Sequence, residues 1–180
     1  MPSKNLTSIE SLVPIISYSL VNNEQTLNVN HKNLLFVLNC LKKHINCQYN
    51  LLTCISGVDL LQSQYRFSVV YEMLSLTFNS RLRVKIFVNE VTSVDSIVPL
   101  FRNANWWERE VWDLYGIYFQ NHPDLRRILT DYGFEGYPMR KDFPLSGYVE
   151  VRYDQTKKRI VVEPVELAQE FRAFSYETPW

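Results

Sequence analysis

The sequence predicts an α/β (α+β) protein: a two-layer domain of helices on a mixed β-sheet, with a long irregular segment and an extended C-terminal arm. Three patterns indicate this fold. Apolar residues between 32 and 45 recur at helical spacing, and those between 66 and 88 alternate with polar residues as in half-buried strands. Between 120 and 148, proline and glycine interrupt any periodicity. We therefore predict an α/β domain over residues 1–119, an ordered loop segment over 120–148, and a late hairpin with an extended tail over 149–180.

Length and charge set the class of protein. The 180 residues suffice for one domain with an extension and a sizeable core. Nineteen Lys and Arg balance nineteen Asp and Glu, which argues against a nucleic-acid partner and against a polybasic membrane-surface protein. Only seven of these charges precede residue 66, so the specific surface is expected after it. No apolar stretch approaches the length of a spanning helix, and the N-terminus lacks an import address, so we expect a cytosolic or organelle-encoded product.

The first half of the chain predicts one helix and three strands. The helix over 32–45 carries Lys42, Lys43 and His44 in its last turn, where positive charge suits the helix dipole. Residues 49–61 are typical of a strand, with Gly57 as a bulge or turn. Two extended runs, 66–78 and 81–88, are predicted to form a hairpin joined at Asn79 and Ser80.

Two further helices and a short strand are predicted between 92 and 119. Thr92 or Ser93 is expected to cap a short helix. Because proline is tolerated only in the first turn of a helix, the helical part is expected to start near Pro99. Asn105 is expected to cap a second helix, which Gly116 ends as a left-handed residue. Residues 117–119 then favour a short strand.

The remaining chain combines an irregular segment with a second hairpin. The segment 120–148 contains too many hydrophobic residues to be disordered, so we expect it to be ordered by packing. Residues 149–153 and 159–163 are predicted to form the late hairpin, which Pro164 ends, and an apolar tail follows.

The cysteines and histidines do not predict a metal site. Cys40, Cys47 and Cys54 are not arranged in closely spaced pairs, and the three histidines lack a metal-binding spacing. We expect buried or half-buried free thiols in a reducing compartment.

The charged helix around residue 110 supports two interpretations. In the first, Glu110 and Asp113 form a carboxylate pair for acid/base catalysis, with His122 as proton shuttle. In the second, they belong to a salt-bridged surface face, where Arg109 neutralises Asp113 and Arg126 or Arg127 reaches the other carboxylates. The sequence contains no phosphate loop or nucleophile elbow that would support an enzyme. Tryptophans 106, 107 and 112, interleaved with charges, are typical of a protein–protein interface.

Several motifs in the second half resemble one family. They are Glu108-Arg109-Glu110 with Trp112-Asp113-Leu114-Tyr115-Gly116, His122-Pro123-Asp124-Leu125-Arg126-Arg127-Ile128-Leu129, Gly133-Phe134-Glu135-Gly136, Arg140-Lys141-Asp142-Phe143-Pro144-Leu145-Ser146-Gly147-Tyr148, and Val162-Glu163-Pro164-Val165-Glu166-Leu167-Ala168-Gln169-Glu170-Phe171-Arg172. This resembles the thirty-kilodalton hydrophilic subunit family of respiratory complex I, in its organelle-encoded form. The resemblance covers about residues 106–179.

The resemblance implies a function and a set of partners. It implies a core structural subunit of the peripheral arm of NADH:ubiquinone oxidoreductase, on the matrix side of the mitochondrial inner membrane. The subunit would brace the quinone module during electron transfer from NADH to ubiquinone and proton pumping. Its C-terminal arm would lie on other complex I subunits, chiefly the large hydrogenase-like one. The alternatives are a subunit of the plastid-type NAD(P)H-quinone oxidoreductase and a stand-alone acid/base enzyme.

The resemblance also implies which residues matter. Family members carry no catalytic residue, flavin or iron–sulfur cluster in this subunit, so those cofactors are expected in partner subunits. The signature residues are expected to be structural or docking residues: Glu108, Arg109, Glu110, Asp113, Gly116, His122, Pro123, Arg126, Arg140, Lys141 and Asp142.

Overall fold

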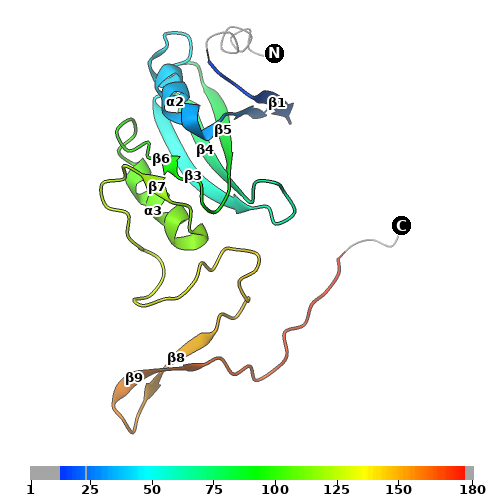
Figure 1. The fold of residues 1–180 in the computed structure, drawn as a ribbon, viewed down its shortest axis with the longest axis vertical. Coiled ribbons are helices and arrows are strands. Elements are labelled where there is room, and N and C mark those ends of the chain that lie inside the picture. The colour runs from blue at the N-terminus through cyan, green and yellow to red at the C-terminus, as the bar shows by residue number, and fades with distance from the viewer. Residues whose placement is uncertain (1–12, 23, 177–180) are drawn as a thin grey trace. The chain divides into compact units, whose positions relative to one another are not determined.

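The computed structural model describes residues 13–22 and 24–176, which fall into two compact units, Met1–Lys141 and Asp142–Trp180 (Figure 1). The first unit contains a five-stranded sheet in the order β1-β2-β5-β4-β3. Its strands are β1 (Ser17–Val21), β2 (Glu24–Asn28), β3 (Leu51–Asp59), β4 (Phe67–Ser75) and β5 (Ser80–Val88). β2 pairs parallel to β5 and all other neighbours are antiparallel, so the predicted mixed sheet is confirmed.

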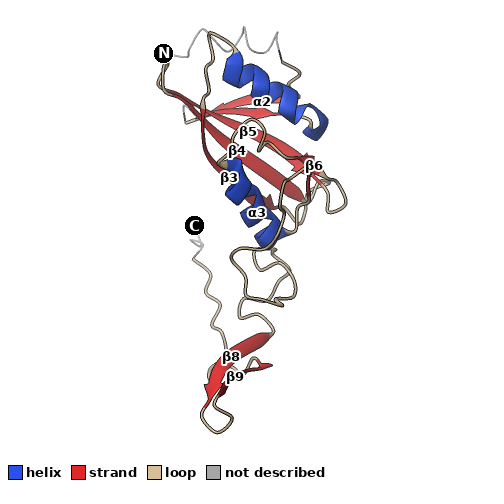
Figure 2. Cartoon of the chain, turned by 90° about the vertical axis from the view of Figure 1, so that its left-hand side faces the viewer, coloured by secondary structure: helices blue, strands red, loops and turns tan. Residues whose placement is uncertain are grey.

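Two helices, α2 (Leu34–Lys43) and α3 (Ala104–Tyr115), pack against one face of this sheet (Figure 2). A 3-10 turn, η1 (His31–Asn33), precedes α2. The predicted alternation on β5 is confirmed, because Leu82, Val84, Ile86 and Val88 are at most 1% exposed. The residues between them lie on the opposite face. The predicted helix over 32–45 and the predicted hairpin of β4 with β5 are also confirmed.

The prediction that Gly57 forms a bulge or turn is wrong. Gly57 lies within β3 opposite Val69, and the register of β3 with β4 shifts between Leu52 and Cys54 instead. A Cβ at position 57 would lie 2.6 Å from the Tyr115 ring at the end of α3. Glycine is needed here because the helix approaches the sheet closely.

The prediction of a short helix after Thr92 is also wrong. This stretch forms a two-residue strand, β6 (Val94–Asp95), followed by turns up to α3. β6 pairs parallel with β7 (Phe119–Gln120), close to the short strand predicted at 117–119. A residue of α3 stabilises the turn after β6, because the carboxylate of Glu108 accepts the N–H of Ile97.

The C-terminal end of α3 agrees with the prediction, and its N-terminal end does not. Asn105 lies inside the helix, and Asn103 occupies the cap position without a capping hydrogen bond. The Asn103 side chain instead donates to the Leu52 carbonyl at 2.7 Å and joins the helix to β3. Gly116 ends the helix in the left-handed conformation, with φ 74°, as predicted.

The second unit contains the predicted late hairpin, β8 (Val149–Asp154) and β9 (Arg159–Pro164). Residues 120–141 of the predicted loop segment belong to the first unit, and 142–148 belong to the second. Between β7 and β8 the chain forms turns and irregular structure. Within residues 13–22 and 24–176, no helix has both the length and the apolar character required to span a membrane.

Candidate functional site

Three buried carboxylates organise the irregular parts of the first unit. Glu108 and Asp113 lie on α3, and Asp59 ends β3; the three side chains have no exposed surface. This corrects the interpretation of the helix as a salt-bridged surface face. Each carboxylate accepts at least one backbone N–H from a segment distant in the sequence, so each one fixes the path of that segment.

Asp113 holds the loop that follows α3. Its Oδ2 accepts the N–H groups of Ile128, Leu129 and Thr130 at 3.1, 2.7 and 2.9 Å, and its Oδ1 accepts the Thr130 hydroxyl at 2.6 Å. Burial alone would raise the pKa of Asp113, but the hydrogen bonds from Thr130 and the two preceding N–H groups outweigh burial and lower that pKa. The carboxylate is therefore ionised and holds the loop near neutral pH.

The expected pairing of Arg109 with Asp113 does not describe this site. Nε of Arg109 donates to the carbonyl of Arg126 at 3.1 Å, while Nη1 of Arg127 lies 3.7 Å from Oδ1 of Asp113. The loop therefore gains a second attachment to α3 through a backbone carbonyl. The Arg126 side chain is exposed and pairs locally with Asp124 at 2.9 Å.

Asp59 holds the far end of the same loop. It accepts two hydrogen bonds from Arg66, at 3.0 and 3.2 Å, and one from the N–H of Lys141 at 2.8 Å. Burial would raise the pKa of Asp59, but Arg66 and the Lys141 N–H outweigh it and lower that pKa. The Lys141 side chain is exposed, so its backbone makes this attachment.

Arg140 closes the site over the end of α3. Its Nε donates to the Tyr115 carbonyl at 2.7 Å, and its guanidinium lies 4.6 Å from the Tyr137 ring centroid and 5.1 Å from that of Phe67. Gly116 lies beneath this stack, and a Cβ there would come within 2.6 Å of the Tyr137 ring. Position 116 therefore requires glycine for two reasons, the left-handed turn and the close approach of the loop.

The third carboxylate, Glu108, faces a buried histidine. It accepts the Ser96 hydroxyl at 2.6 Å and the Ile97 N–H at 2.7 Å, and its Oε2 lies 3.8 Å from Nε2 of His122. Burial raises the pKa of Glu108 to about 7, because these two hydrogen bonds only partly offset it.

The hydrogen bonds of His122 fix its tautomer. Its Nδ1 accepts the N–H of Asp124 at 3.1 Å, so the proton lies on Nε2, which faces the Asn105 carbonyl at 3.2 Å. Burial, with a smaller contribution from Arg109, lowers the pKa of His122 despite the Asn105 hydrogen bond. The ring is therefore neutral at physiological pH.

The proposed catalytic grouping is not brought together. His122 faces Glu108 rather than Glu110, and the Asp113 oxygens are occupied by backbone and hydroxyl donors. Glu110 is half-buried, while Pro123 and Asp142 are exposed. The geometry is that of a braced loop.

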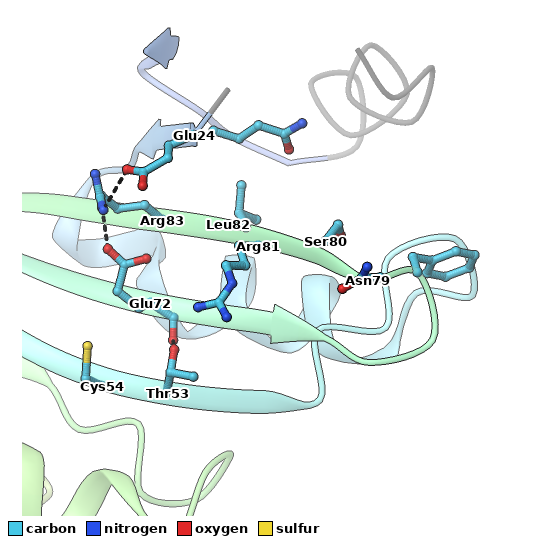
Figure 3. Close-up of a pocket in the computed structure, with 11 residues that line it drawn as sticks. Glu24, Thr53, Cys54, Glu72, Asn79, Ser80, Arg81, Leu82 and Arg83 are labelled. Carbon is cyan, nitrogen blue, oxygen red and sulfur yellow. Dashed lines mark hydrogen bonds and ion pairs between the residues drawn. The ribbon is translucent and has the colours of Figure 1, made fainter. Parts of the chain in front are cut away.

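A hollow of about 690 Å³ lies beside the outer face of the sheet, near the β4–β5 turn (Figure 3). Arg83 links Glu24, at 3.0 Å, with Glu72, so its charge is already compensated. Burial and the nearby Glu72 raise the pKa of the Cys54 thiol, which disfavours a reactive thiolate. The hollow therefore combines internal ion pairs with an unreactive cysteine.

The cysteines behave as predicted for structural thiols. Cys47 is buried, Cys40 and Cys54 are half-buried, and all three are free. Among the residues that the structure describes, no group of three His, Cys, Asp or Glu is placed to hold a metal ion.

The second unit presents a different kind of surface. Alternation along β8 and β9 places Val149, Val151, Tyr153, Ile160 and Val162 on one face of the hairpin, and all five are 54–68% exposed. The opposite face carries Arg152, which makes two hydrogen bonds to Glu163 at 2.6 and 2.7 Å. We call this hairpin the ribbon and its row of five apolar residues the apolar face.

Sequence reasoning missed Asp59, Tyr137 and Thr130. Asp59 ends an apolar strand and resembles an ordinary polar strand end, and its partner Lys141 lies 82 residues away. Tyr137 and Thr130 lie in a segment without periodicity. The only available signal was Gly116, since a left-handed glycine ending a helix next to an aromatic-rich loop is typical of close packing.

Comparison with known proteins gives consistent matches. A family described as "Respiratory-chain NADH dehydrogenase, 30 Kd subunit" matches residues 27–149. NADH-ubiquinone oxidoreductase subunit 9 of Reclinomonas americana is 58% identical over 157 residues, covering 87% of this chain and 77% of that protein. NADH dehydrogenase (ubiquinone) iron-sulfur protein 3 of Arabidopsis thaliana is 59% identical over 147 residues, covering 81% and 77%.

A solved structure also shares the fold. It is that of the membrane-bound sulfane sulfur reductase (MBS), an archaeal respiratory membrane complex, one chain of which matches with a TM-score of 0.67. The match covers 78% of this chain and 84% of that one at 20% identity, so the likeness concerns the fold alone.

Proposed function

The chain belongs to the 30 kDa subunit family of respiratory-chain NADH dehydrogenase, and we propose that it is a non-catalytic core structural subunit of the peripheral arm of NADH:ubiquinone oxidoreductase. It braces the quinone module on the matrix side of the mitochondrial inner membrane, chiefly against the large hydrogenase-like subunit. The names of the relatives, which specify ubiquinone, support this branch over a plastid-type enzyme.

The observation that carries the proposal is the apolar face of the ribbon. A two-stranded hairpin is at best marginally stable in water by itself. Here its five large apolar side chains remain more than half exposed, with Leu167, Phe171 and Phe174 exposed in the following tail. Such surface is typical of an element that gains its stability by packing on another protein.

We also propose that the flavin and iron–sulfur clusters of the enzyme are held by partner subunits. A cluster with four thiolate ligands needs four cysteines, and this chain has three. Burial raises the pKa of Cys47, the opposite of what a thiolate ligand requires. Replacing all three cysteines by serine should leave the electron paramagnetic resonance spectrum of the clusters, per assembled complex, unchanged. Loss of one cluster signal would contradict this assignment.

The ribbon provides the main test. Val151→Ser combined with Val162→Ser should lower the amount of assembled complex on native gels, while turnover per assembled complex stays normal. Val91→Ser is a matched control, because Val91 is fully exposed in a turn of the first unit. Normal assembly with low turnover would indicate a catalytic role instead.

The braced loop offers a second test. Arg140→Ala removes the hydrogen bond to Tyr115 and the stack on Tyr137, so it should also reduce assembly more than turnover. Arg126→Ala alters an exposed side chain and would act through lost partner contacts only. Comparing the two variants separates bracing of the loop from direct docking.

A further inference from the structure

The loop held by Asp113 displays two apolar residues, Leu129 and Tyr132, outward. Asp113 fixes the backbone at residues 128–130. Directly after these residues the chain turns, and the Phe134 N–H donates a hydrogen bond to the Asp131 carbonyl at 3.2 Å. Tyr132 lies at the corner of this turn and is fully exposed, and Leu129 is 58% exposed. We call residues 129–135 the loop tip.

Polar contacts hold the loop tip in place, although Tyr132 and Leu129 stay largely exposed. Asp131 accepts the Tyr132 N–H at 2.7 Å, and Arg127 donates to the Gly136 carbonyl at 3.0 Å while lying 5.1 Å from the Tyr137 ring centroid. Ordering a loop costs conformational entropy, which buried contacts normally offset. Here the ordered backbone presents a tyrosine and a leucine to the solvent. A binding surface benefits from such order, because a loop that is already fixed loses less conformational entropy on binding.

The charge around the loop tip limits the partner. Asp131 and Glu135 are exposed on either side of Tyr132. The nearby cation, Arg127, points back to Asp113 and Gly136. The tip is thus an apolar anchor with an acidic border.

We propose that the loop tip is a docking anchor in which Tyr132 and Leu129 enter an apolar recess of a partner protein subunit bordered by Lys or Arg. The inference rests on the proposed function, since it supposes a multi-subunit complex. It identifies a contact in the first unit that is separate from the ribbon. Aromatic anchors in preorganised loops commonly supply a large share of interface energy.

Photo-crosslinking in the assembled complex tests the anchor. A benzophenone amino acid at position 132 should form an adduct with a peptide of one partner subunit that contains Lys or Arg next to apolar residues. The same probe at position 151, on the ribbon, reports whether the chain is in the complex at all. An adduct at 151 with none at 132, or an adduct of 132 to lipid or to a second copy of this chain, overturns the anchor and leaves the proposed function intact. Absence of the chain from any large assembly overturns the proposed function itself.

Substitutions measure the strength of the anchor. Tyr132→Ala should weaken retention of the chain in the complex roughly tenfold or more, measured as the fraction that stays assembled in dilute chaotrope. Glu135→Lys should weaken it at low salt more than at high salt, because the acidic border then opposes the basic recess. Leu76→Ser is the matched control, since Leu76 is an exposed apolar residue in the β4–β5 turn. Equal retention of all three variants and of the unmodified chain would overturn the proposal.

Discussion

The strand β5 and the ribbon use the same sequence pattern with opposite results. β5 and the ribbon strand β8 alternate apolar with mostly polar residues, and Val162 on β9 lies opposite Val151 on β8. Yet Val84 on β5 has no exposed surface, whereas Val151 and Val162 are 55% and 64% exposed. β5 lies inside a sheet of five strands covered by α2 and α3, while the ribbon pairs two strands only. Alternation therefore indicates which side chains share a face, and the number of strands and helices around them decides whether the chain covers that face itself.

The polar contacts differ in the same way. The first unit buries three carboxylates and satisfies them with its own N–H and hydroxyl groups. The ribbon keeps its ion pair between Arg152 and Glu163 in solvent, where such pairs contribute little. Removing one of these three carboxylates should thus lower the stability of the first unit, whereas removing the pair of Arg152 and Glu163 should change that of the ribbon little.

The largest expected effect is at Asp113. Asp113→Asn replaces an ionised acceptor of four hydrogen bonds by a neutral amide. Its oxygen can take the place of Oδ2, but its NH2 group then takes the place of Oδ1 and meets two donors, the Thr130 hydroxyl and Arg127, while the negative charge is lost. We expect a loss of about 4 kcal/mol in the free energy of unfolding, measured by urea denaturation. Asp124→Asn is the control, because the Asp124 carboxylate is exposed and pairs with an exposed side chain, that of Arg126. Similar losses in both variants would contradict the contrast between buried and exposed carboxylates.

A second effect depends on pH and involves Glu108. The pKa of Glu108 is about 7 in the folded protein against 4.5 for an ordinary glutamate, so the folded state binds the proton more tightly. This contribution to stability is fully present below pH 4.5 and is lost as the pH rises through 7, by about 3 kcal/mol in total. Glu108→Gln stays neutral and should not show this loss, so the stability difference between the two proteins should change over that pH range.

The other buried carboxylates act in a separate pH range. The pKa values of Asp113 and Asp59 are lowered, so their contribution is present above their ordinary pKa of 3.8 and is lost as the pH falls below it. Between pH 4.5 and pH 8 the lowered pKa of His122 also affects stability, in the opposite direction and in both proteins, so the difference between the two proteins reports Glu108. A parallel dependence in the unmodified protein and in Glu108→Gln would show that Glu108 is not the buried titrating group.

The third effect separates backbone strain from packing. Gly116 and Gly133 both have left-handed φ angles, of 74° and 71°, but a Cβ would contact the Tyr137 ring at 116 and nothing within 4 Å at 133. Gly133→Ala should cost about 1 kcal/mol for strain alone. Gly116→Ala should cost about 2 kcal/mol more, because the loop must move away from α3. Equal losses in thermal denaturation would show that the loop does not pack on the helix end.

Elements defined by local pattern could be predicted from the sequence, and the buried site could not. The helix α2, the hairpin of β4 with β5 and the left-handed Gly116 each follow from residues close together in the chain. The predicted helix after Thr92 failed because Glu108, eleven residues away from Ile97, accepts the Ile97 N–H.

The charged face of α3 was misjudged for the same reason. Helical spacing shows that Glu108 and Asp113 are on a helix, but their partners are backbone N–H groups, which every residue except proline carries. A sequence therefore gives no sign of which loop returns to cover a carboxylate. Gly57 was misplaced because its neighbour Tyr115 lies 58 residues further along the chain.

The smallest effect tests the opening comparison directly. Val84→Thr places a hydroxyl in the core and should lower the free energy of unfolding by about 2 kcal/mol. Val151→Thr makes the same chemical change on the ribbon, where the side chain already meets water, and should change it by less than about 0.5 kcal/mol. In the assembled complex, Val151→Thr should weaken retention of the chain more than Val84→Thr does, because it places the hydroxyl in an interface. If Val151→Thr destabilised the isolated chain as much as Val84→Thr, the ribbon would be covered by this chain itself, and its apolar face would no longer support a partner.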